Sequence, residues 1–162
     1  MRHNSLRRPV LACLAALLAW CAGVATAAPA APDLLPLSDE DIAMAPGAGP
    51  ACGCGFYASA RRDAPLLLYW SRAADRRAIL RDAQGVHRVG VRSERFVPQA
   101  PYGERMVLFF ADPVWQIQAI GTVTEACRPK QACTATVYRA RLLTQYEGGG
   151  RRHAEVVARC GC

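Results

Sequence analysis

The chain has 162 residues, a formal net charge of +7 and eight cysteines. That length suits a single domain with a modest hydrophobic core. After residue 24 no apolar segment is long enough to cross a bilayer, which excludes a transmembrane helix in the mature chain and predicts that the mature chain is soluble.

The first 27 residues have the pattern of a signal peptide. Arginines precede an apolar run over residues 10–24, and Ala25-Thr26-Ala27 has the small-x-small pattern of a cleavage site. We therefore expect residues 1–27 to be removed and the mature protein to be periplasmic or secreted. Lipid attachment at Cys21 is an alternative, which Trp20 disfavours because it is a poor residue just before a lipidated cysteine.

Charge is unevenly distributed along the mature chain. Removal of the leader leaves 17 basic and 13 acidic residues, and four of the acids precede Cys52. Residues 52–162 therefore carry a net charge of +8, from 17 basic and 9 acidic residues. Such a domain could contact another protein or an anionic envelope component, such as lipopolysaccharide, anionic lipid or acidic glycan. The alternative is that scattered arginines simply keep a small domain soluble.

Residues 28–50 are rich in Ala, Pro and Gly and contain the four early acids, which is typical of an arm or tether. A short helix is predicted within residues 37–44, because Ser38 is a good N-cap, acids follow it, and Pro46-Gly47 ends it. Nearby apolar side chains could dock on the domain or on a partner. The composition favours the other interpretation, a disordered arm.

Residues 51–162 form the predicted domain, in which strand-like runs alternate with turns and no long helical pattern occurs. The clearest runs, Val114–Thr124 and Thr134–Tyr146, each have one apolar and one polar face, as in antiparallel sheets. A glycine-rich turn leads from them to a last strand over 151–159, and a separate short strand is expected over Glu94–Val97. About seven strands in sequence order predict an all-β antiparallel meander that forms a small barrel or a curled sheet.

The tripeptide Cys-Gly-Cys occurs twice, at residues 52–54 and at residues 160–162. In an extended strand the two cysteines of each copy lie on one face. Antiparallel pairing with Gly53 opposite Gly161 would bring the cysteines to a separation that disulfides tolerate. The predicted bonds between the copies are Cys52–Cys162 and Cys54–Cys160.

Removal of the leader leaves six cysteines, and an even number in an exported chain indicates disulfides. Cys127 and Cys133 lie across the mouth of the long hairpin, so we expect them to pair, which would stabilise the fold by roughly 2 kcal/mol. The first bond between the Cys-Gly-Cys copies closes about a hundred residues and would contribute roughly 4 to 5 kcal/mol. The second closes almost no new loop, but it fixes the register of the first strand against the last.

The predicted domain starts with Cys52-Gly-Cys54-Gly-Phe56, has Cys127 and Cys133 in its hairpin and ends with Arg159-Cys160-Gly161-Cys162. This arrangement resembles small exported bacterial β-domains of unassigned function, some of them lipid-anchored. The resemblance covers residues 51–162, implies a β fold and brings no activity with it. A fainter similarity to netrin-type inhibitor modules on an OB barrel ranks lower, because those modules place the first cysteine pair closer to the long hairpin.

Two other uses of the paired Cys-Gly-Cys motifs compete with the disulfides. Four thiolates, from Cys52, Cys54, Cys160 and Cys162, would suit zinc or copper(I). A bond within the terminal motif would close a strained ring that suits thiol–disulfide exchange. Disulfides between the motifs are the preferred interpretation, because the destination of an exported chain is oxidising.

No catalytic group and no cofactor are predicted. His87 and His153 are the histidines of the mature chain, and such single histidines are more typical of surface positions than of a base beside a nucleophilic cysteine. Acidic residues occur singly rather than as a pair placed for acid–base chemistry. We therefore predict a non-catalytic binding or envelope-structural domain with no nucleic-acid ligand. The candidate polyanion contacts are Arg88, Arg92, Arg139, Arg141, Arg151, Arg152 and Arg159.

Overall fold

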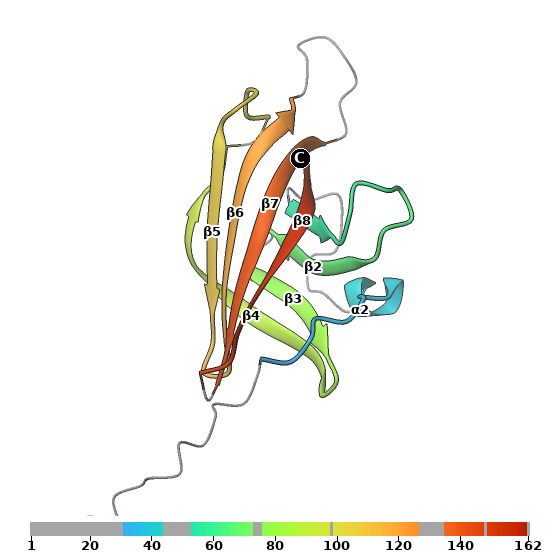
Figure 1. The fold of residues 1–162 in the computed structure, drawn as a ribbon, viewed down its shortest axis with the longest axis vertical. Helices are drawn as coiled ribbons and strands as arrows, with labels where there is room; N and C mark the ends of the chain where they lie inside the picture. The colour runs from blue at the N-terminus through green and yellow to red at the C-terminus, as the bar shows by residue number, and fades with distance from the viewer. Residues whose placement is uncertain are drawn as a thin grey trace, which may run out of the picture.

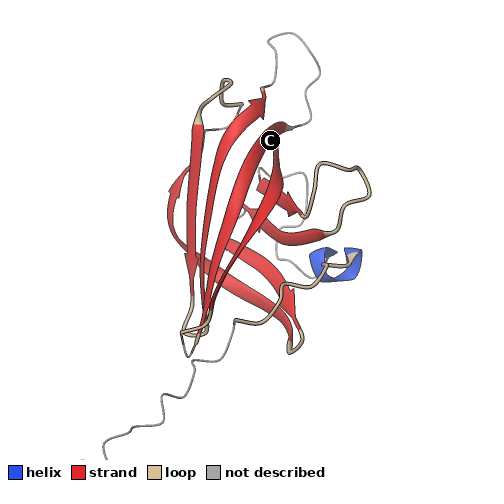
Figure 2. Cartoon of the chain, in the orientation of Figure 1, coloured by secondary structure: helices blue, strands red, loops and turns tan. Residues whose placement is uncertain are grey.

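The computed structural model describes residues 31–43, 53–72, 76–97, 99–126, 135–147 and 149–161. Its elements are α2 (Asp39–Ala43), β1 (Gly53–Tyr57), β2 (Leu66–Ser71), β3 (Arg77–Asp82), β4 (Gly85–Arg95), β5 (Arg105–Ala111), β6 (Trp115–Glu125), β7 (Thr136–Tyr146) and β8 (Arg151–Gly161). The strands form one closed antiparallel barrel in sequence order, with β8 paired to β1 (Figure 1). Strands dominate the described chain, and α2 lies outside the barrel wall (Figure 2). The prediction of an all-β antiparallel meander is confirmed, with eight strands in place of about seven.

The predicted signal peptide, residues 1–27, and the predicted hairpin cysteines, Cys127 and Cys133, lie outside the described residues. Within the described ranges, no helix has the length and apolar content needed to cross a membrane.

The strand prediction fails at β4, which runs without interruption from Gly85 to Arg95. The separate strand expected over Glu94–Val97 is wrong, because Glu94 and Arg95 are the end of β4. The pairing of β4 with β5 shifts register between Val91 and Ser93. A bulge of this kind inserts an extra residue and breaks the two-residue alternation, so one strand has the sequence pattern of two.

Alternate side chains of the long strands fill the interior of the barrel. Every second residue of β6 from Trp115 to Val123 is buried, and β7 follows the same pattern from Thr136 to Thr144. The largest of the fully buried side chains include Trp70, Trp115 and Tyr138. Burying a large apolar side chain stabilises a fold by roughly 1.5 to 3 kcal/mol. Among the described residues, large apolar side chains therefore pack the inside of the barrel as a core.

The barrel closes where β1 pairs with the second half of β8. Gly53 lies opposite Gly161 and Cys54 opposite Cys160, which confirms the predicted register. A Cβ atom on Gly53 would lie 2.3 Å from the backbone oxygen of Trp70 in β2. The glycine is required there because β1 and β2 approach each other closely.

β1 is short and covers only residues 157–161 of β8, so the first half of β8 extends past it. The N-terminal arm lies in this neighbouring part of the wall, beside β3 and the start of β8 (Figure 1). The backbone N–H of Leu35 donates to Arg81 O at 2.8 Å, and the N–H of Leu37 donates to Leu66 O at 2.8 Å. Leu37 packs with Ile79, and Ala31 is fully buried. The preference for a disordered arm is therefore wrong for residues 31–43, which dock on β2 and β3.

The predicted short helix is confirmed as α2, which starts after Ser38. The Asp41 N–H donates to Ser38 Oγ at 3.1 Å, and the Ser38 N–H donates to Asp41 Oδ2 at 2.8 Å, a reciprocal capping arrangement. Arg81 Nη1 lies 2.7 Å from Asp41 Oδ2 and joins the helix to β3. The backbone hydrogen bond from Ser38, with help from the Ser38 hydroxyl and Arg81, lowers the pKa of Asp41 despite the opposing effect of burial.

Candidate functional site

The outward side chains of β5, β6, β7 and β8 lie in rows across the barrel wall, because the four strands pair without a register shift as far as Val123 in β6. Neighbours across strands are about 5 Å apart, and successive rows are about 7 Å apart. We call this surface the β5–β8 face. Its rows are Ala111–Gln116–Gln145–Arg151, Phe109–Gln118–Leu143–His153, Val107–Ile120–Arg141–Glu155 and Arg105–Thr122–Arg139–Val157.

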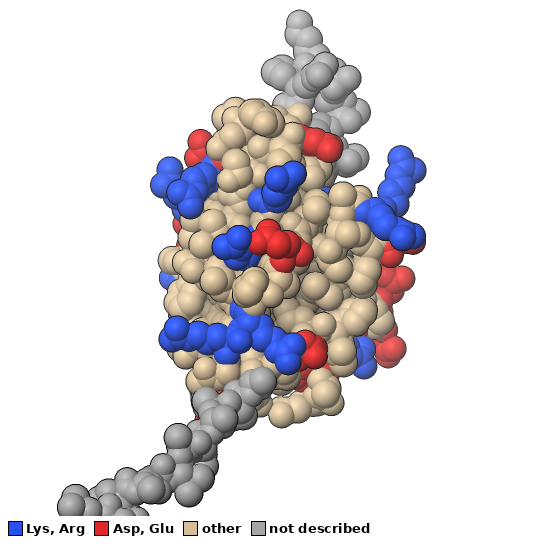
Figure 3. All heavy atoms as spheres, viewed as in Figure 1, with Lys and Arg blue, Asp and Glu red and all other residues tan. Residues whose placement is uncertain are grey.

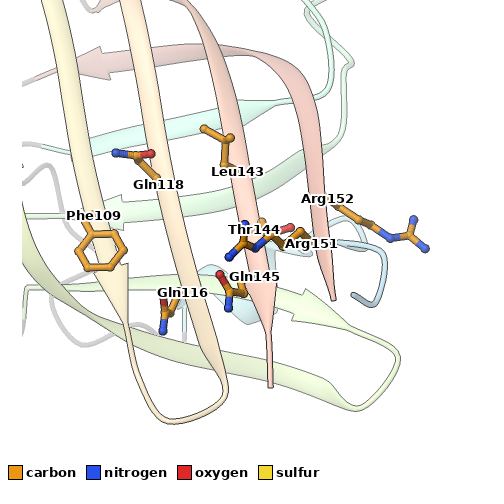
Figure 4. Close-up of a pocket in the computed structure, with 8 residues that line it drawn as sticks. All are labelled: Phe109, Gln116, Gln118, Leu143, Thr144, Gln145, Arg151 and Arg152. Atoms are coloured by element: carbon orange, nitrogen blue, oxygen red, sulfur yellow. The ribbon is translucent and has the colours of Figure 1, made fainter. Parts of the chain in front are cut away.

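Two open hollows lie on the β5–β8 face and share Gln118 and Leu143. The hollow nearer the start of β8 has a volume of about 260 Å³, and the other has a volume of about 440 Å³. Figure 4 shows Gln116 and Gln118 on β6 beside Leu143 and Gln145 on β7. Because the hollows share residues, they form one trough, which is lined mainly by Arg105, Phe109, Gln116, Gln118, Ile120, Arg139, Arg141, Leu143, Gln145 and Arg151.

The trough carries more positive than negative charge. Its acid, Glu155, accepts a hydrogen bond from Arg141 Nε at 2.8 Å, and both side chains are more than half exposed. Within the described part of the chain, Arg105, Arg139 and Arg151 form no ion pair. In the space-filling view, basic side chains are spread over this face of the barrel and acidic ones lie beside some of them (Figure 3). The trough therefore offers three guanidinium groups to an anionic ligand.

Four of the seven arginines predicted to contact a polyanion line this trough: Arg139, Arg141 and Arg151, with Arg152 at its edge. Arg152 is the next residue along β8, so it points to the other side of the strand. Its guanidinium pairs with Asp33 of the arm and points away from the other labelled side chains in Figure 4.

The other three arginines lie elsewhere. Arg159 sits over the ring of Tyr57 at 4.7 Å and donates to Ala60 O at 2.9 Å, so it holds the β1–β2 loop. Arg88 and Arg92 are on β4, four strands from β8 in a barrel of eight, although Arg92 Nε reaches Ala111 O of β5 at 3.2 Å. The seven arginines therefore do not share one face, and their contact with a polyanion stays a prediction.

Sequence reasoning missed most of the residues that line the trough. Arg105, Phe109, Leu143 and Gln145 were not proposed as contacts, because the outward side chains involved are spread over four separate strands. The available signal was the alternation of Gln116 and Gln118 with buried residues in β6. Aligning the outward positions of four successive strands would have placed these residues side by side.

The predicted bond Cys54–Cys160 is present, with an S–S distance of 2.04 Å and a Cα–Cα distance of 4.1 Å. Both residues are buried, and Cys160 Sγ lies 4.0 Å from Met106 Sδ in the core. Cys52 and Cys162, the other predicted pair, lie outside the described residues. A disulfide uses two of the four sulfurs that the metal alternative needs as thiolates. Among the described residues, no group of three or more His, Cys, Asp and Glu side chains is placed to hold a metal ion.

His87, a histidine weighed as a catalytic base, lies instead beside a structural carboxylate. His87 Nε2 is 2.9 Å from Asp82 Oδ1, and the same oxygen accepts hydrogen bonds from the N–H groups of Gln84 and Gly85. Asp82 is buried and holds the β3–β4 turn. Asp82 is therefore placed to cap the β3–β4 turn, and His87 contacts this capping carboxylate.

Comparisons of the chain with protein-family models, with curated proteins and with solved structures give no significant match. The function must therefore be argued from the geometry of the barrel itself.

Proposed function

We propose that this protein is an exported, non-catalytic binding domain that holds an anionic component of the cell envelope against the β5–β8 face. The observation that carries the proposal is the trough, where Arg105, Arg139 and Arg151 lack ion-pair partners among the described residues. The packed interior supports an external contact, since large side chains fill the barrel.

Export is part of the proposal. The basic, apolar and small-residue pattern of residues 1–27 supports it, and the Cys54–Cys160 disulfide is consistent with an oxidising destination. The thiolate metal or redox alternative is less well supported, because two of the four sulfurs it needs form a buried disulfide.

The experiment is retention of the oxidised mature chain on immobilised heparin, a soluble stand-in for an envelope polyanion. Raising the salt from about 0.05 M to about 0.5 M shortens the range of charge interactions to a few ångströms, so retention should fall steeply. The double variant Arg139→Ala/Arg151→Ala should bind roughly fivefold to thirtyfold more weakly, if each exposed charge contributes about 0.5 to 1 kcal/mol.

The matched control is Arg62→Ala, which removes an exposed arginine from the β1–β2 loop, away from the trough. It should leave the affinity close to that of the unmodified protein. Retention that ignored salt, or an equal loss in the control and the trough variant, would contradict the proposal.

A further inference from the structure

We infer that the ligand of the trough is an acidic polysaccharide, a chain of hydroxyl-bearing sugar rings with anionic substituents. This inference rests on the proposed function and names the class of ligand. It is carried by three carboxamides, three apolar side chains and three arginines that the strand register places within one trough.

The carboxamides of Gln116, Gln118 and Gln145 form a cluster. Gln116 lies directly opposite Gln145, and Gln118 is two residues along β6 from Gln116 on the same face. Their spacing is therefore about 5 Å across the strands and about 7 Å along them. Among the described residues, none of the three carboxamide groups has a hydrogen-bond partner, so the cluster is open to a ligand.

A carboxamide both donates and accepts hydrogen bonds, as a hydroxyl group does. A carboxylate or phosphate group only accepts, and it would face the amide oxygens without a donor. Three open carboxamides therefore match a ligand rich in hydroxyl groups. A ligand that carried only anionic groups would leave half of this hydrogen-bonding capacity unused.

The floor between the carboxamides is apolar. Phe109 and Leu143 flank Gln118 in a single row, and Ile120 continues the floor in the next row. Leu143 is 37% exposed, so its side chain is accessible from the trough. Such a floor suits the C–H faces of sugar rings, while the carboxamides reach the hydroxyls at the ring edges.

The three guanidinium groups that form no ion pair among the described residues lie at the two ends of the trough. Arg151 is in the first row, and Arg105 and Arg139 are in the last, so about 20 Å separates the two ends along the strands. This separation favours an extended, repeating polymer with anionic groups along it over a single small anion. A bilayer surface fits less well, because the trough is a hollow and a flat lipid surface would not reach its floor.

Three probes test the inference: polygalacturonate, an acidic polysaccharide; polyglutamate, which has carboxylates but no sugar rings; and anionic vesicles of phosphatidylglycerol. The unmodified oxidised protein should bind polygalacturonate at least tenfold more tightly than polyglutamate of similar charge. The double variant Gln118→Leu/Gln145→Leu keeps the net charge and should lose on the order of tenfold in affinity for polygalacturonate, with little change for polyglutamate.

The matched control is Gln84→Ala, since Gln84 lies in the β3–β4 turn and its side-chain amide contacts Tyr146 instead of the trough. Thermal melting of each variant checks that the barrel is folded. Arg139→Ala/Arg151→Ala should weaken the binding of both polymers.

The outcomes separate this inference from the proposed function. Equal affinity for the two polymers, with no effect of the glutamine variant, would overturn the polysaccharide and leave a general polyanion site. Preference for the vesicles over both polymers would overturn it in favour of a lipid surface. Failure to bind either polymer, together with failure to bind heparin, would remove both proposals.

Discussion

Cys54 and Cys160 are joined across the strands that close the barrel, although 106 residues separate them in sequence. Their bond links the first strand to the last, so the closure of the wall is covalent as well as hydrogen-bonded. The register that places them opposite each other also aligns Gly53 with Gly161.

The cysteine bonds should not contribute additively to stability. If Cys52 and Cys162 also pair, the variant Cys54→Ala/Cys160→Ala keeps the large loop closed and loses mainly packing, roughly 1 to 2 kcal/mol. Replacement of all four cysteines opens the loop and should lower the free energy of unfolding by roughly 4 to 6 kcal/mol in total. Urea unfolding of the two variants measures the difference. Equal losses in both would show that Cys52 and Cys162 do not close the barrel.

Gly53→Ala should destabilise the barrel, because the new Cβ would lie 2.3 Å from the backbone oxygen of Trp70. Overpacking of this kind costs roughly 1 to 3 kcal/mol. Gly90→Ala is the matched control, since the nearest atom to its new Cβ, the Ala111 oxygen, is 3.8 Å away. Chemical unfolding should separate the two variants, and similar stabilities would argue against the close approach of β1 and β2.

The docking of the arm should weaken in acid. The pKa of Asp41 is lowered in the folded protein, chiefly by the backbone hydrogen bond from Ser38, so its charged form is favoured there. This stabilisation is present above the ordinary aspartate value of about 4 and is lost as the pH falls through the folded pKa. The methyl resonances of Leu37 and Ile79, which pack together, should report the release.

Asp41→Asn removes this titration. In that variant the methyl resonances of Leu37 and Ile79 should not change in that pH range. Asp39→Asn changes an exposed acid of the same helix and should behave like the unmodified protein. An acid transition that persisted in Asp41→Asn would assign the release to another group.

Tyr138→Phe should leave stability unchanged or raise it by up to about 1 kcal/mol. Tyr138 is buried in the core, and among the described residues its hydroxyl has no hydrogen-bond partner, so the substitution removes an unpaired polar group. Burial, with a smaller effect of the Glu104 charge, raises the pKa of this phenol. The folded protein therefore favours the neutral phenol. The resulting stability is fully present below the ordinary tyrosine pKa of about 10 and is lost as the pH rises through the higher pKa of the folded state. The phenylalanine variant should unfold less readily than the parent in alkali, and thermal melting at rising pH measures the difference.

The fold was largely predictable because its local and long-range patterns agree. Trp115 to Val123 and Thr136 to Thr144 alternate between buried and exposed positions, as the sequence of each strand predicts. The two Cys-Gly-Cys motifs predicted the closing register correctly. The pattern failed at the bulge after Val91, where an extra residue changes the phase of the alternation.

The arm and the trough could not be predicted in the same way. The composition of residues 31–43 is typical of a disordered segment. Contacts with Leu66, Ile79 and Arg81 order these residues, and the three partners belong to strands that come later in the chain. The trough depends on the relative register of four strands. Glutamines and arginines on separate strands carry no signal of their proximity until that register is known.

The most direct test of the β5–β8 face as a binding surface is to map backbone amide chemical shifts while heparin is added to the isotope-labelled, oxidised protein. We expect saturable chemical-shift changes in β5, β6, β7 and β8, strongest near Gln118, Arg139 and Arg151, with the amides of β2 and β3 unchanged. Shifts concentrated in β2, β3 or the arm, or the lack of any saturable shift, would contradict the claim that the β5–β8 face holds an anionic ligand.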